Sequence, residues 1–76
     1  DGMGLTDLSL LATLTQLRNL YVCSEGELYY AESLTQLNHL QDLILEGKNF
    51  TRDTINRLKE MFSYVPTCMI SAPDNG

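Results

Sequence analysis

The segment LTQLNHLQDLIL, residues 34–45, decides the fold because its leucine spacing changes within twelve residues. Leucines stand at every third position from Leu34 to Leu43, and the next one, Leu45, follows after only two. A spacing of three or four suits one face of a helix, whereas a spacing of two suits a strand with one buried side. The segment therefore predicts a helical arc that runs directly into a short strand.

The same change of spacing occurs 23 residues earlier, so the chain repeats itself. Leucines stand at positions 11, 14, 17 and 20 and are followed by Val22, while Cys68 and Ile70 occupy the corresponding strand positions of a third segment. We therefore expect an α/β fold with parallel strands near 20–22, 43–45 and 68–70 and helical arcs between them. In this register Tyr21 and its counterparts point away from the core.

One clearer helix is expected over residues 53–63. Ile55, Leu58 and Phe62 fall on one face of it, and Thr51 or Asp53 can cap its start. Pro66 then ends it. Asp7 or Ser9 can cap an earlier short helical piece that ends near Leu17.

Composition predicts a single soluble module over residues 1–76, with a polar tail at 72–76. Hydrophobic residues make up 43% of the chain and charged residues 20%, as in a globular domain. No apolar run reaches the ~18 residues of a membrane span. The net charge of −5 argues against a nucleic-acid surface, which requires a basic stripe.

The two cysteines, Cys23 and Cys68, are expected to be free thiols. They fall in the first and third predicted strands, which are separated by two ladder steps of about 4.8 Å each. The total separation of about 9.6 Å exceeds the ~7 Å that a disulfide can bridge. Free thiols favour a reducing compartment such as the cytoplasm.

The sequence contains no pattern that indicates catalysis, a cofactor or a metal. The single histidine, His39, has no Cys, Asp or Glu around it at metal-ligand spacing. Phosphate-binding loops, nucleophile elbows and paired-carboxylate motifs are also missing. We therefore expect a non-catalytic chain without a cofactor.

The repeat resembles the leucine-rich-repeat family. The resemblance rests on Leu17-x-x-Leu20-x-Val22 and Leu40-x-x-Leu43-x-Leu45, which follow the family pattern L-x-x-L-x-L. LTDLSLLATLTQLRNL is similar to the internalin-like form, and LQDLILEGKNFTRDTINRL to the longer form of ribonuclease inhibitor and NOD-like receptors, so the subtype stays open. The resemblance implies a short solenoid of about three units, covering residues 5–71.

The chain departs from the family pattern in its turns. The family places an asparagine three residues after the second strand leucine, where these positions hold Glu25, Lys48 and Pro73, and Asn49 comes one residue late. The turns must therefore find other hydrogen-bond partners. The helix over 53–63 is a candidate C-terminal cap, which suggests the C-terminal end of a longer solenoid. The N-terminal side shows no cap, so self-association through an uncapped end is expected.

The predicted strand register places one candidate site on the concave face of such a solenoid. Tyr21, Ile44 and Met69 form a row there, an aromatic and aliphatic surface suited to a protein partner. Residues on either side of this row give it a partly acidic rim: Asn19, Asp42, Thr67, Cys23, Glu46 and Ser71. The sequence therefore predicts a protein-recognition module.

Two alternatives remain. Glu32-Ser33-Leu34 in an acidic chain is faintly similar to the Asp-Ser-Leu of acyl carrier proteins, which would place a phosphopantetheine arm on Ser33. The glycine usual just before that motif is missing, and a helical bundle does not explain the change of leucine spacing. The chain can also be a purely structural capping fragment of a larger receptor or effector.

Overall fold

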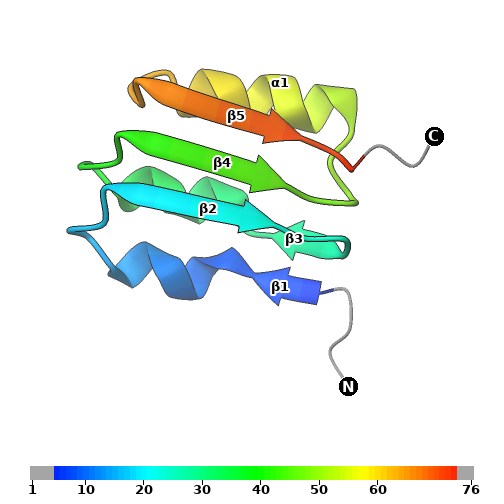
Figure 1. Cartoon of the computed structure of the whole chain (residues 1–76), viewed down its shortest axis with the longest axis horizontal. Helices are drawn as coiled ribbons and strands as arrows, with labels where there is room; N and C mark the ends of the chain where they lie inside the picture. Colours follow the sequence, from blue (N-terminus) through cyan, green and yellow to red (C-terminus); the bar gives the residue numbers. More distant parts are fainter. Residues whose placement is uncertain (1–4, 74–76) are drawn as a thin grey trace.

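The computed structural model describes residues 5–73, which form two small parallel sheets with helical segments beside them (Figure 1). Residues 74–76 of the predicted tail lie outside this range. In chain order the elements are β1 (Leu5–Asp7), the 3₁₀ helix η1 (Leu8–Thr13), β2 (Asn19–Cys23), β3 (Glu27–Tyr29), the 3₁₀ helix η2 (Ala31–Gln36), β4 (Asp42–Glu46), α1 (Arg52–Met61) and β5 (Thr67–Ser71).

The larger sheet has the strand order β2-β4-β5, and all its strands are parallel. Tyr21 pairs with Ile44, and Ile44 pairs with Met69. The three predicted strands and their register are therefore confirmed. Each strand is two residues longer than predicted, because the ladder continues for one residue at each end.

The smaller sheet consists of β1 and β3, which pair in parallel from Leu5–Glu27 to Asp7–Tyr29. The sequence did not predict either strand. Each spans only three residues, too few to show a hydrophobic period, so long-range pairing decides their conformation.

The prediction of a short leucine-rich-repeat solenoid of about three units is wrong. The described residues form two separate sheets, and the segments between the strands of the larger sheet are not equivalent. One connection adds β3 before η2, whereas the next is the ten-residue helix α1 alone. The physical reason is that part of the chain expected as a plain arc pairs as a second sheet.

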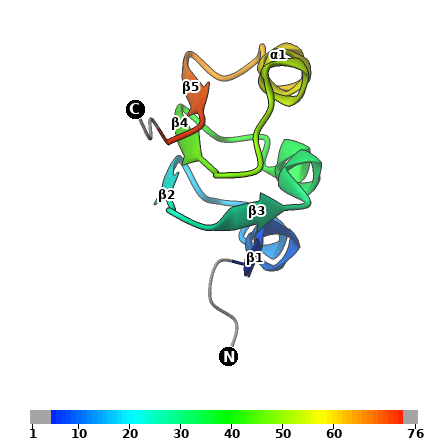
Figure 2. The same cartoon turned by 90° about the vertical axis from the view of Figure 1, so that its right-hand side faces the viewer.

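The core lies between the larger sheet and the helical segments, which occupy opposite sides of the molecule in Figure 2. Leu43 and Leu45 of β4 point inward and are completely buried, as are Leu34 and Leu37 of the preceding arc. Phe62, the residue directly after α1, is also completely buried in this core. No polar or charged residue is buried among the residues that the structure describes.

Side-chain caps fix where two of the helices begin. The Asp7 carboxylate accepts the backbone N–H of Ser9 at 2.9 Å and so caps η1. Thr51 Oγ1 accepts the backbone N–H of Thr54 at 3.2 Å and caps α1. The predicted helix over 53–63 is therefore present, shifted toward its N-terminus by one to two residues.

Candidate functional site

The candidate site is the outward face of β2, β4 and β5, and the structure brings all its predicted residues together. Tyr21 and Met69 are 61% and 60% exposed, while Ile44 between them is half-buried. Neighbouring strands lie about 4.8 Å apart, so the row extends for roughly 10 Å across the sheet. We call Tyr21, Ile44 and Met69 the apolar row.

The polar residues beside the apolar row give this face a negative character. Asp42 and Glu46 flank Ile44 on β4, two residues before and after it, and both are half-buried. The Asn19 amide, oriented with its nitrogen toward β4, donates to Asp42 Oδ2 at 2.7 Å. None of the residues on this face of the three strands is a lysine or an arginine.

The remaining predicted residues of the rim are small and polar. Thr67 and Ser71 are exposed at the two ends of β5, and Cys23 is exposed at the end of β2. The thiol of Cys23 thus belongs to the outward face, whereas Cys68 points toward the core and is half-buried. Both are free cysteines, as predicted.

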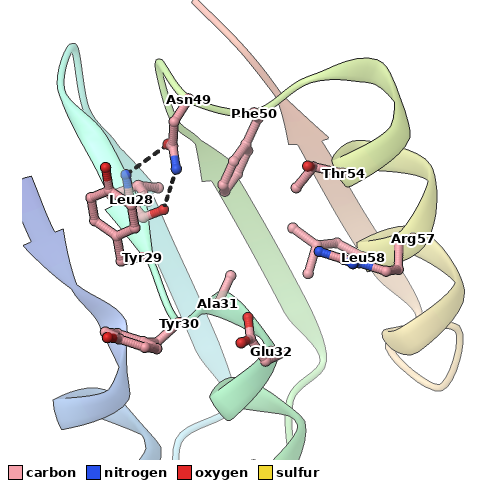
Figure 3. A pocket seen from close by; sticks show the side chains of 10 residues that line it. All are labelled: Leu28, Tyr29, Tyr30, Ala31, Glu32, Asn49, Phe50, Thr54, Arg57 and Leu58. Atoms are coloured by element: carbon pink, nitrogen blue, oxygen red, sulfur yellow. Dashed lines mark hydrogen bonds between the residues drawn. The ribbon is translucent and has the colours of Figure 1, made fainter.

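A pocket of about 170 Å³ lies on the other side of the molecule, between the β3–η2 segment and α1 (Figure 3). Buried Leu28, Ala31, Phe50 and Leu58 form part of its lining. Small-molecule sites usually occupy about 300–1,000 Å³, so this pocket is smaller than such a site.

Two polar side chains of this pocket, Asn49 and Tyr29, form hydrogen bonds with neighbouring groups of the protein. Asn49 Oδ1 accepts the backbone N–H of Leu28 at 2.9 Å, and Asn49 Nδ2 donates to the Leu28 carbonyl at 2.8 Å. The Tyr29 hydroxyl donates to Glu27, which raises the pKa of Tyr29.

Tyr30, at the same pocket, has a backbone conformation that the sequence did not indicate. Its φ of 64° and ψ of 34° lie in the left-handed region, which non-glycine residues adopt at a cost of about 1–2 kcal/mol. The turn from β3 into η2 requires this conformation, and the Tyr30 carbonyl accepts the backbone N–H of Ser33 at 3.0 Å. No residue type in the segment signals it.

The described residues hold no group of three or more His, Cys, Asp or Glu that could bind a metal ion. His39 is exposed in the turn between η2 and β4. Within residues 5–73, no helix has the length and apolar character needed to cross a membrane.

The fold and this face define a small α/β module with an exposed apolar row on a parallel sheet. Searches for related proteins found no matching family model, curated protein or solved structure. The resemblance to leucine-rich repeats thus stays a prediction from the sequence.

Proposed function

We propose that this chain is a non-catalytic recognition module that binds a partner protein through the outward face of β2, β4 and β5. The observation that carries the proposal is the apolar row, in which Tyr21 and Met69 are each more than half exposed. Tyrosine and methionine are enriched at protein interfaces, where a large side chain gains from burial against a partner.

The charges beside the apolar row define the chemistry of the partner. Asp42 and Glu46 stand on either side of Ile44, so a complementary surface presents an apolar side chain flanked by Lys or Arg. Residues 1–46, which include both of these acids, carry seven acidic residues against Arg18 alone. This acidic half attracts a basic partner at long range and increases its association rate.

The small size of the face predicts weak or transient binding. Three strands of five residues form the sheet, and their outward face is well below the ~800 Å² that each partner contributes to a standard interface. Fast, salt-sensitive association with a short-lived complex fits this size and charge.

Site-specific photocrosslinking tests which face the partner contacts. A photoreactive phenylalanine analogue at position 21 or 69 is expected to crosslink one and the same protein, which mass spectrometry then identifies. The matched control is position 64, because Tyr64 is also exposed but follows α1. Crosslinking of the same protein with equal yield from position 64, or only random products from positions 21 and 69, would contradict the proposal.

The carrier-protein alternative loses its structural basis. It assumes a helical bundle, whereas the described chain has two parallel sheets and one α-helix. Ser33 lies inside η2 and is half-buried. The structure offers no observation in favour of a prosthetic arm on this residue.

A further inference from the structure

The N-terminal end of the molecule exposes leucines that have no cover within the described chain. Leu10 is 73% exposed and Leu14 is 49% exposed, and both belong to η1 and the turn that follows it. Leu37, the counterpart of Leu14 in the internal repeat, is completely buried. We call Leu10, Leu14 and Leu17 the leucine end.

The difference between Leu14 and Leu37 comes from their neighbours. The arc that contains Leu37 lies between η1 on one side and α1 on the other, whereas η1 forms the outermost layer (Figure 2). Thr13, Leu14, Thr15, Gln16 and Leu17 line an open, mainly apolar hollow of about 470 Å³ at this end. The leucine end therefore exposes an apolar surface that can pack against another apolar surface.

We propose that the leucine end is a self-association surface, and that its occupant is a second copy of this chain. The charge distribution favours this occupant. Residues 8–17 contain no charged side chain in a chain whose net charge is −5, so two copies can approach here without like-charge repulsion. The outward face of the sheet, in contrast, would bring Asp42 and Glu46 against their own copies.

The area at this end sets the expected strength of the dimer. The molecule measures 33 × 27 × 16 Å, and the leucine end closes it along the 27 Å direction. The whole end of the molecule measures at most 33 × 16 Å, roughly 500 Å², and the leucine end is only part of it, so two copies bury less than about 1,000 Å² in total, below the size of a standard interface. We therefore expect a weak, reversible dimer with two-fold symmetry, because an isologous contact closes on itself.

Sedimentation equilibrium of the full chain, from micromolar to millimolar concentration, tests this inference. The wild-type mass is expected to double as the concentration rises, and this rise should persist at high salt because the contact is apolar. Leu10→Glu and Leu14→Glu are expected to remain monomeric at every concentration. Leu10 is so exposed that its substitution leaves folding intact, which circular dichroism verifies.

Met69→Glu is the matched control, since it places the same charge on the outward face of the sheet and should dimerise like wild type. Three results would overturn the inference: a wild-type chain that stays monomeric at millimolar concentration, a folded Leu10→Glu variant that dimerises normally, or open-ended assembly beyond two copies. The inference does not depend on the proposed function, because it concerns a different surface. A failed crosslink from position 21 would leave it untouched.

Discussion

Asn49 shows how a single side chain can replace a missing strand neighbour. Its amide bonds to both the N–H and the carbonyl of Leu28, as the backbone of an adjacent strand would. Gly47 makes this approach possible, because a Cβ there would lie 3.0 Å from Leu28 Cγ and 3.2 Å from Asn49 Oδ1. In the sequence, Asn49 stands one residue after the position that the leucine-rich-repeat pattern assigns to its turn asparagine. In the structure, the Asn49 side chain holds β3 against the turn.

Replacing Asn49 by alanine is expected to lower the free energy of unfolding by about 1–3 kcal/mol, because both polar groups of the buried Leu28 backbone lose their partners. Urea unfolding followed by circular dichroism measures this loss. Asn38→Ala is the control, since Asn38 is an exposed turn residue, and it should change stability by less than about 0.5 kcal/mol. Equal effects of the two substitutions would refute the role of Asn49.

The two thiols are expected to react at different rates because their surroundings differ. Burial raises the pKa of Cys68, and the nearby Lys59 ammonium counteracts only part of this shift. Since the thiolate is the nucleophile, a raised pKa means a smaller reactive fraction at any given pH. Iodoacetamide should therefore modify exposed Cys23 first, and the rate at Cys68 should still rise at pH values above the ordinary thiol range.

Lys59→Ala is expected to raise the pKa of Cys68 further, because it removes the positive charge that lowers this pKa. Cys68 should then react still more slowly at the same pH, with Cys23 unchanged. Mass spectrometry of the native protein gives both rates, and the urea-unfolded chain supplies the reference. Native Cys68 reacting as fast as Cys23 would contradict the described burial.

At the scale of elements, the larger sheet separates residues that hold the fold from residues that face outward. Leu43 and Met69 both belong to this sheet, but Leu43 is completely buried and Met69 is largely exposed. Leu43→Ala is expected to cost about 2–5 kcal/mol, since it leaves a cavity in the core. Met69→Ala should change the unfolding free energy by less than about 0.5 kcal/mol.

Urea unfolding of the two variants, with wild type in parallel, measures this contrast. A loss of similar size in both would mean that the outward face takes part in the core, and the apolar row would then not be a binding surface.

The sequence predicted β2, β4 and β5 with their register because each carries inward-facing apolar residues at a spacing of two, aligned by the internal repeat. It could not predict β1 or β3, which are too short for any period and depend on pairing between distant segments. The left-handed Tyr30 also had no local signal, because glycine or asparagine normally marks that conformation. The wrong solenoid prediction followed directly from these omissions.

The candidate site followed from register alone, so its residues could be predicted together. The degree of exposure of each residue could not be predicted. Ile44, at the centre of the sheet, has a smaller exposed fraction than its neighbours Tyr21 and Met69. Tyr21 and Met69, on the outer strands, are therefore the expected anchors of the apolar row.

At the scale of the whole molecule, two surfaces of different character lie on one small fold. The outward face combines an apolar row with two carboxylates, whereas the leucine end is apolar and uncharged. Partner binding at the outward face is expected to weaken as the salt concentration rises, whereas dimerisation at the leucine end is not. Varying the ionic strength therefore distinguishes the two kinds of binding.

The most direct test of the central claim is calorimetric titration of the partner identified by crosslinking with the Tyr21→Ala/Met69→Ala double variant. Loss of two exposed anchors is expected to weaken binding by about 10-fold to 100-fold, or about 1.4–2.8 kcal/mol, while the unfolding free energy stays close to wild type. Tyr64→Ala is the control and should bind like wild type. An unchanged affinity in the double variant would contradict the account.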